Sequence, residues 1–247
     1  MTKQTLILGL IVGLLTSVPA LAQAWEKFDE ENGIVSYRKP VAGSPIVAFK
    51  GEADVKASIE KILWVLTNNE HKPKWVDRMK KSYELEKKTP YHAIVYQVFK
   101  LPVPISNRDY VYEGKITRKG EQILVNLKSV SHRKAPPVEG VRAYLKRCTY
   151  VLTPKGDNLT HISVEVHTDP RGWLPSWLVN IIQKKWPIRT LSGIQKMVTK
   201  SYVGTLAAPP RPAPPAPPAA PAAPEMSTSP DAASSSAPSS EAPAVSE

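Results

Sequence analysis

The chain of 247 residues has a single cysteine, Cys148, which excludes a disulfide within the chain. Its fold must therefore be held by a hydrophobic core alone, which a domain of this length can supply. Cys148 lies in an alternating, strand-like run with no evident base beside it. This setting predicts a buried structural thiol and not a nucleophile.

Several common signals of chemistry are also missing from the sequence. It has no Ser/His/Asp order, no pair of catalytic carboxylates and no phosphate-binding loop. His161 and His167 would be roughly 20 Å apart along one strand, which is too far for a single metal ion. We therefore expect no catalytic residues, no metal and no cofactor.

Long apolar runs are limited to one, at residues 6–15, which follows a lone charge at Lys3. The run is shorter than the about 20 residues that a membrane span needs. Small residues follow it, so we predict a secretory signal peptide over 1–24, cleaved after Ala22 or Ala24. An uncleaved anchor is the alternative. An exported protein without disulfides is typical of a bacterial periplasm, with secretion as the alternative.

Large apolar residues are scarce in the last part of the chain, 205–247. Of these 43 residues, 12 are Pro and 13 are Ala, and Ser and Thr supply much of the rest. Such a composition cannot bury enough apolar surface to offset the entropy of ordering, so this segment is predicted to be a disordered tail.

Residues 25–204 remain as one folded domain of about 180 residues. This domain has 31 basic and 18 acidic residues, a net charge of +13. A basic domain is attracted to nucleic acid or to anionic lipid headgroups. The predicted export argues against nucleic acid as a partner. We therefore expect the protein to be a monomer that binds an anionic membrane surface.

The pattern within the domain predicts an α+β fold. Residues 33–39 and 44–54 are typical of strands, and Asp54 could cap a helix whose apolar residues Ile59, Ile62 and Leu66 recur at helical spacing. From Met79 onward the alternation has period two, and short polar turns separate about seven further strands. Local connections of this kind make an antiparallel sheet.

The last predicted element is a long amphipathic helix. One face of it carries the apolar residues Leu174, Trp177, Leu178, Ile181 and Ile182. Pro187 should kink or interrupt this helix, because proline lacks a backbone donor and clashes with the preceding turn. A sheet of about seven to nine strands tends to curl. A curled sheet closed by a helix encloses a cavity if the facing side chains do not fill it.

Two stretches of the domain resemble a known family. These are "KLPVPISNRDYVY" at 100–112 and "DPRGWLPSWLVN" at 169–180. Both are similar to the StAR-related lipid-transfer (START) family, and most closely to its phosphatidylcholine-transfer branch, here as an exported bacterial member. The resemblance implies a helix-grip fold: a curved antiparallel sheet around a long C-terminal helix, with a lipid-sized cavity. It also implies a lipid carrier that is not an enzyme, with a gate formed by the C-terminal helix and the loop at 131–141.

The residues expected to bind lipid or to form this gate are Gln97, Arg108, Tyr112, Val138, Tyr144, Trp173, Leu174, Trp177, Leu178 and Ile181. Arg108 and its neighbour Asp109 also fit a purely structural role, as a charged pair that holds a loop. In cholesterol-carrying members of the family, a buried acid–arginine pair occupies the positions of Gln97 and Gly114. Its absence here weakens a simple sterol interpretation.

Phospholipid is therefore the first choice of ligand, with a sterol, a hopanoid, another isoprenoid or a fatty acid as alternatives. Two other functions remain open at this point. One is a helix-grip enzyme acting on a small hydrophobic ligand, with Gln97, Tyr112 or Tyr144 as candidate polar residues. The other is a membrane-surface module that docks through its basic face and holds no ligand.

Overall fold

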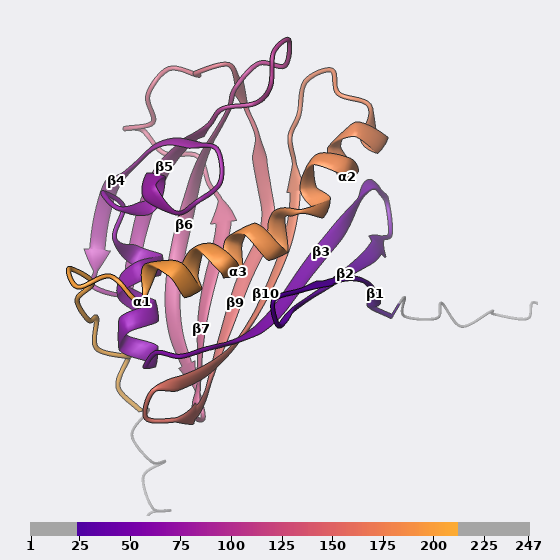
Figure 1. Cartoon of the computed structure of the whole chain (residues 1–247). Coiled ribbons are helices and arrows are strands. Elements are labelled where there is room, and N and C mark those ends of the chain that lie inside the picture. The colour runs from indigo at the N-terminus through magenta and orange to yellow at the C-terminus, as the bar shows by residue number, and fades with distance from the viewer. Residues whose placement is uncertain (1–23, 212–247) are drawn as a thin grey trace, which may run out of the picture. The chain divides into compact units, whose positions relative to one another are not determined.

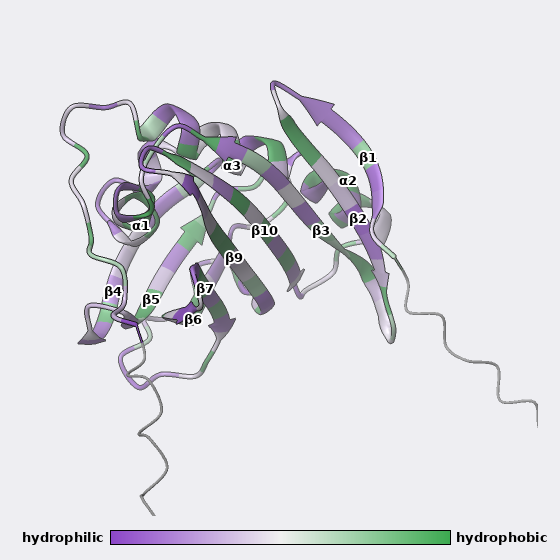
Figure 2. Cartoon of the chain, turned by 90° about the horizontal axis from the view of Figure 1, so that it is seen from below, coloured by the Kyte–Doolittle hydropathy of each residue, from purple (hydrophilic) through white to green (hydrophobic). Residues whose placement is uncertain are grey.

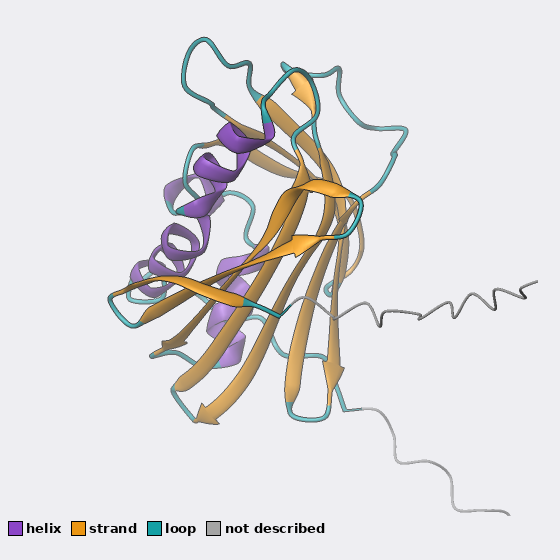
Figure 3. Cartoon of the chain, turned by 90° about the vertical axis from the view of Figure 1, so that its right-hand side faces the viewer, coloured by secondary structure: helices purple, strands orange, loops and turns teal. Residues whose placement is uncertain are grey.

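The computed structural model describes residues 24–211 as one compact unit. The predicted signal peptide, except for Ala24, and the chain from residue 212 onward lie outside the described residues. All ten strands of the described part belong to one sheet, and its helices lie on the same face of that sheet (Figure 3). The predicted helix-grip architecture is confirmed, with ten strands where about seven to nine were expected.

The strand order is β1-β2-β3-β10-β9-β7-β6-β5-β4, and all pairs along this path are antiparallel. The short β8 pairs in parallel with the start of β6. The sheet curves into an arc from β4 to β1, and α1 and α3 lie inside the arc (Figures 1 and 2). The strands are β1 (Glu26–Glu31), β2 (Ile34–Val41), β3 (Ser44–Val55), β4 (Met79–Thr89), β5 (His92–Phe99), β6 (Arg108–Lys119), β7 (Gln122–Ser129), β8 (Val141–Arg142), β9 (Tyr144–Gly156) and β10 (Leu159–Asp169).

The strands form because apolar side chains alternate with polar ones, so that one face of the sheet is apolar. In β10, Ile162 and Val164 are fully buried, whereas Ser163 between them is only partly buried. The predicted structural thiol Cys148 is buried in β9, where it pairs in register with Val166.

Helix α1 (Ile59–Thr67) begins four residues later than the predicted cap would place it. Its N-cap is Ser58, whose Oγ accepts a hydrogen bond from Lys61 N at 3.4 Å. Asp54 instead belongs to β3, where its carboxylate pairs with Lys155 and His161. The cap prediction was wrong because the strand continues to Val55, and the pairing of β3 with β10 holds Asp54 in the sheet.

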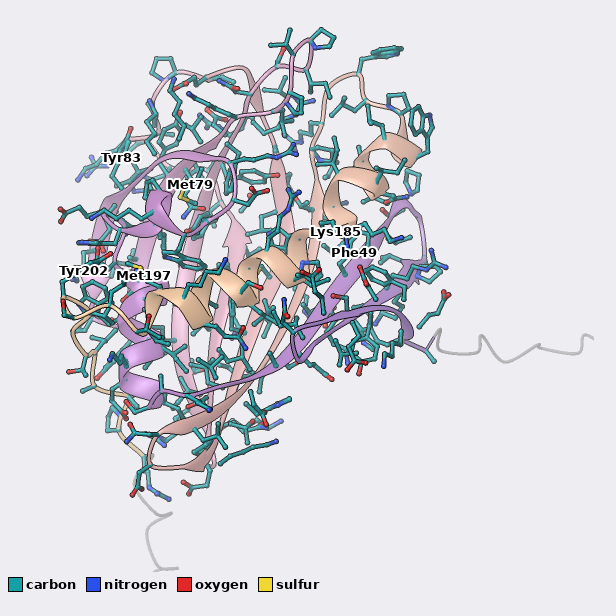
Figure 4. All side chains as sticks on the ribbon, viewed as in Figure 1. Phe49, Met79, Tyr83, Lys185, Met197 and Tyr202 are labelled. Atoms are coloured by element: carbon teal, nitrogen blue, oxygen red, sulfur yellow. The ribbon has the colours of Figure 1, made fainter. Side chains whose placement is uncertain are left out.

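The C-terminal helix is interrupted as Pro187 predicted. It consists of α2 (Ser176–Lys184) and α3 (Trp186–Met197), and Lys185 lies between them. Pro187 occupies the first turn of α3. Backbone N–H groups in a first turn have no acceptor within the helix, so the lack of an N–H at proline costs no hydrogen bond there. Lys185 lies at the junction close to β3, and its Nζ is 2.9 Å from Asp29 Oδ2 of β1 (Figure 4).

Helix α3 packs directly against β3 at Gly51. A Cβ atom at this glycine would lie 2.8 Å from Pro187 Cβ and 3.0 Å from Leu191 Cδ1. Only glycine permits the helix to approach the strand this closely. The contact fixes α3 across the middle of the sheet and leaves α2 beside the end of the sheet where β3 begins (Figure 1).

The packed chain extends past the predicted domain end at residue 204. Leu206 N donates to Glu60 O at 2.9 Å, and Arg118 Nε donates to Pro209 O at 2.7 Å. Arg211 forms an ion pair with Glu121. Residues 205–211, which were assigned to the tail, therefore lie against α1 and the turn between β6 and β7, because backbone hydrogen bonds hold a segment with few large side chains.

Candidate functional site

A cavity of about 240 Å³ lies between the concave face of the sheet and helices α2 and α3. Side chains from six strands and three α-helices contribute to its wall, and most of them are apolar or aromatic. Its apolar wall includes Leu66, Met79, Phe99, Leu101, Val125, Leu127, Leu145, Val166, Leu174, Val179 and Ile182. The volume lies just below the range of about 300–1,000 Å³ that is usual for small-molecule sites. The predicted cavity is therefore present, but in this form it is small for a whole two-chain lipid.

The tyrosine hydroxyls and the cysteine thiol of β6 and β9 in this wall are neutral near pH 7. Burial raises the pKa of Cys148 to about 12. Burial also raises the pKa of the Tyr110, Tyr112 and Tyr150 hydroxyls above its usual value. Tyr110 forms a hydrogen bond with Thr168 Oγ1 at 3.1 Å. These side chains offer polar atoms without negative charge.

Gln97 lies in the wall at the start of a chain of hydrogen bonds. Its Nε2 donates to Ser82 Oγ at 3.1 Å, and Ser82 Oγ donates to Asn69 Oδ1 at 2.8 Å. Lys72 Nζ donates to the same Asn69 oxygen at 2.8 Å. Lys72 belongs to the 3-10 turn η1 (Lys72–Lys74), so this chain links β5 and β4 to the segment after α1. Sequence reasoning did not single out Lys72, because lysines are rarely buried.

Two other polar atoms of the wall have no hydrogen-bond partner in the described structure. They are Trp75 Nε1, a donor, and Gln183 Oε1, an acceptor, and both are buried. Buried polar groups are nearly always satisfied in native proteins, so unsatisfied ones in a cavity indicate where a ligand's polar atoms could bind.

Arg108 lines the cavity, but its guanidinium is used to hold the backbone. It donates to Ser106 O at 2.6 Å, to Pro170 O at 2.7 Å and to Arg171 O at 3.1 Å. These bonds join the start of β6 to the segment between β10 and α2. The contacts of Arg108 therefore fit the alternative role given above, in which this residue holds a loop in place.

Asp109 has the corresponding role on the other side of the strand. Its buried carboxylate accepts from Arg142 Nε at 2.6 Å, from Tyr96 Oη at 3.0 Å and from Glu139 N at 3.0 Å. These bonds secure the C-terminal part of the loop at 131–141 against β5 and β6. Since burial and the neighbouring Asp109 carboxylate raise the pKa of Tyr96, its hydroxyl remains a donor in this network.

The structure corrects the predicted inward face of the C-terminal helix. Trp177 is 64% exposed and Ile181 is 60% exposed, and neither contributes to the cavity. Leu178 is also absent from the wall, whereas Leu174 is part of it. The inward residues of the helix are instead Val179, Ile182, Gln183 and Trp186.

This inward set is spaced i, i+3, i+4, i+7, and it is rotated by about one residue, roughly 100°, from the predicted face. The rotation follows from the packing of α2 on β3. Asn180 Oδ1 accepts a hydrogen bond from Val47 N at 3.3 Å, which turns Asn180 toward the strand and Val179 into the interior.

Three other predicted site residues lie outside the main cavity. Trp173 is 92% exposed in the bend before α2, and Val138 is 53% exposed in the loop at 131–141. Tyr144 lines a second hollow at the surface, with the Arg171 guanidinium 5.1 Å from the centre of its ring. The cavity therefore brings together Gln97, Arg108, Tyr112 and Leu174 from the predicted set.

Within residues 24–211, no helix has the length and hydropathy to cross a membrane. The same residues contain no group of three or more His, Cys, Asp or Glu side chains that could hold a metal ion. His161 and His167 have separate partners: His161 Nδ1 lies 2.7 Å from Asp54 Oδ1, and His167 Nε2 lies 3.1 Å from Ser44 Oγ.

A curved antiparallel sheet that grips a C-terminal helix over an apolar cavity defines a helix-grip protein. The START domain model matches residues 13–198, so the chain belongs to the START domain family. Membership of this family implies lipid binding or lipid transfer.

Known relatives agree with this assignment. The chain is 28% identical over 169 residues to the phosphatidylcholine transfer protein of Rattus norvegicus, across 66% of this chain and 78% of the relative. The solved StAR-related lipid transfer protein of Xanthomonas axonopodis is 27% identical, with a TM-score of 0.64, across 71% of this chain and 99% of that one. Human STARD10 has a TM-score of 0.65 at 22% identity, across 72% and 74% of the two chains, and supports the fold alone.

The buried state of Cys148 leads to a first prediction. Because its thiol lines the cavity and its pKa is raised to about 12, a thiol reagent such as Ellman's reagent at pH 8 should modify the native protein very slowly. The rate should rise by at least about a hundredfold when urea unfolds the chain, since the thiolate fraction and the access both recover. Equal rates for the native and unfolded protein would show that Cys148 is exposed.

Proposed function

We propose that this protein is a periplasmic lipid carrier that holds one lipid in the cavity and exchanges it at membranes. The observation that carries the proposal is an apolar interior cavity closed by a helix in a START domain. The apolar run and small residues of 1–24 support export, and phosphatidylcholine transfer by the rat relative makes phospholipid the first choice of ligand. A sterol or another isoprenoid is the alternative.

A carrier of this kind acts by solvation and not by catalysis. Each methylene group favours leaving water by about 0.8 kcal/mol, so a free lipid crosses water slowly. An apolar cavity replaces the membrane interior at little net cost and requires no chemical fuel. The wall contains neutral hydroxyl and thiol groups, and its thiol has a pKa too high for a nucleophile at neutral pH. We therefore propose a carrier and not an enzyme.

Lipid uptake requires the wall to separate, because the cavity of about 240 Å³ is smaller than usual ligand sites. We propose that α2 is the part that moves. Helix α2 packs mainly on β3 and α3, its Lys184 ammonium lies 5.6 Å from the centre of the Phe28 ring of β1, and one side chain, Asn180, bonds it to the β3 backbone. The loop at 131–141, by contrast, is secured by the buried Asp109. The gate thus has a fixed side in the loop and a movable side in the helix.

The same helix carries apolar side chains on its outer face. Trp177 and Ile181 are exposed there, Trp173 is exposed in the bend just before the helix, and Lys184 and Lys185 follow at its C-terminal end. Indole rings favour the membrane–water interface, and lysines are attracted to anionic headgroups. This combination supports docking of α2 on a membrane, where its displacement would open the cavity toward the lipids.

The carrier proposal predicts a lipid of defined stoichiometry. Native mass spectrometry of residues 25–247, purified from the periplasm of its host, should detect one co-purifying lipid per chain, and extraction should identify it. The same protein should accelerate transfer of labelled phosphatidylcholine between vesicles. A protein that elutes empty and transfers no phosphatidylcholine, sterol or other lipid of the host would refute the carrier, and would favour a membrane-surface module.

Docking through α2 leads to a prediction about the tryptophans. Replacing Trp173 and Trp177 together with alanine should weaken binding to vesicles of mixed phosphatidylcholine and phosphatidylglycerol by at least about tenfold, roughly 1.4 kcal/mol. Stability should change little because both side chains are exposed. Vesicle co-sedimentation measures the binding.

Tyr202→Ala provides the matched control for that measurement. Tyr202 is also an exposed aromatic residue, but it lies beyond the end of α3, away from α2 (Figure 4). Its replacement should leave vesicle binding unchanged. An equal loss in the control and in the tryptophan variant would argue against a specific docking surface on α2.

A further inference from the structure

Lys72 is a buried cation in the cavity wall. It begins the 3-10 turn η1 between α1 and β4, and only 7% of the residue is exposed. Its side chain contributes to the wall together with Trp75, three residues later in the same segment. Lysine is almost never buried to this degree unless it is paired, so its surroundings indicate what it binds.

The described structure gives the Lys72 ammonium one hydrogen bond, to Asn69 Oδ1 at 2.8 Å. An ammonium group has three donors, so two are left without an acceptor there. The ion pairs found in residues 24–211 do not include Lys72. The carboxylate of Glu84 in β4 is near, but its Oε1 accepts from Asn69 Nδ2 at 3.4 Å, so an amide lies between the two charges.

Burial without a paired anion destabilises the charged lysine. Burial lowers the pKa of Lys72 to about 8, and the charge of Glu84 opposes part of that effect. The ammonium form therefore still predominates at pH 7. An anion placed beside it would be stabilised in a region of low dielectric constant, where such an interaction is stronger than in water.

The other charges of the wall add to this positive potential. Its cations are Lys72, Arg78, Arg108 and Arg189, and its one carboxylate is Asp77. Asp77 is already paired, with Oδ2 at 2.6 Å from Arg189 Nη1 and at 3.5 Å from Arg78 Nε. The tyrosines and Cys148 are held neutral by burial. The wall thus has a surplus of three positive charges and no free carboxylate.

Trp75 supplies a second buried hydrogen-bond donor in the cavity wall. Its Nε1 is buried and has no acceptor in the described structure. Its position is fixed by α3, since a Cβ atom at Gly193 would lie 2.6 Å from Trp75 O and 3.0 Å from its ring. One short segment of the wall therefore contains an ammonium with two donors left over and a buried indole N–H without an acceptor. Two donors of this type suit the oxygens of an acidic group.

We propose that the cavity binds an anionic amphiphile, whose carboxylate or phosphate is held by Lys72 and Trp75 while its hydrocarbon chain lies along the apolar wall. The inference rests on the proposed carrier function and specifies its ligand class. It favours an acidic lipid over a zwitterionic one, because a choline headgroup would add a further cation to a wall that already has a surplus.

The test uses cis-parinaric acid, a fluorescent fatty acid, and its uncharged methyl ester with delipidated full-length protein. The acid should bind about tenfold to a hundredfold more tightly than the ester, as expected for a hydrogen-bonded charge. Lys72→Met should remove this preference and keep the affinity for the ester. Lys74→Met is the matched control: it removes the same charge from the same turn, but Lys74 is exposed, so the preference should remain.

A pH titration of the unaltered protein tests the inference without any variant. An anion raises the pKa of Lys72 in the complex above the value of about 8 in the free protein. Affinity for the acid should therefore be full between about pH 6 and 8, where both the carboxylate and the ammonium are charged, and should fall as the pH rises from 8 toward 10. The ester should show no such fall. The other charged groups of this region, Glu84, Asp77 and the three arginines, are present in both measurements, so the comparison of acid and ester isolates Lys72.

Competition separates the two possible acids. Displacement of parinaric acid by oleate or by lysophosphatidate, more strongly than by lysophosphatidylcholine, supports the inference, and the stronger competitor identifies the acidic group. Equal displacement by lysophosphatidylcholine, or equal affinity of the acid and its ester, would overturn it. In that case tight binding of the ester would still support a lipid carrier, whereas failure of every probe to bind would count against the carrier itself.

Discussion

The close contact of α3 with β3 at Gly51 is the constraint on which the cavity depends. Because a glycine hydrogen occupies the place of a side chain, Pro187 and Leu191 rest directly on the strand. This fixes one half of the C-terminal helix on the sheet. The sheet curves away from that line toward β4, and the space between is only partly filled by side chains from β5, β6, β7 and β9. The cavity is therefore the space that a curved sheet and a straight, anchored helix cannot fill.

Two buried charged residues, Arg108 and Asp109, hold the segments around them in place. Arg108 holds the backbone at Pro170 and Arg171, and Asp109 holds the loop at Glu139 and Arg142. Removing one partner from a buried ion pair such as Asp109–Arg142 costs about 3–5 kcal/mol, and Arg108 adds hydrogen bonds from a charged donor, so these segments are firmly attached. Helix α2 has no comparable anchor among the described contacts, and its outer face is apolar. The difference in attachment is the physical basis for assigning the movement to α2.

The strand pattern and the resemblance of two motifs were sufficient to predict the helix-grip architecture and the break at Pro187. The inward face of α2 could not be predicted, because both of its faces are apolar and the inward one includes Gln183. Hydrophobic periodicity locates a single apolar face, and Trp177 and Ile181 made the outer face look like the core. The burial of Lys72 could not be predicted either, since a lysine beside Pro73 in a polar stretch is typical of an exposed turn. Only the packing of η1 on β4 buries it.

We propose that lipid enters and leaves the cavity by displacement of α2 from β3. A disulfide between Val47→Cys and Asn180→Cys tests it most directly, because these two residues join α2 to β3 by a hydrogen bond and the native Cys148 is buried. The measured quantity is the rate of labelled phospholipid transfer between vesicles by the oxidised and reduced forms of the same protein. The oxidised form should remain folded but transfer little lipid, and reduction of the disulfide should restore the transfer rate. Equal rates in both forms, with the disulfide verified by mass spectrometry, would contradict it.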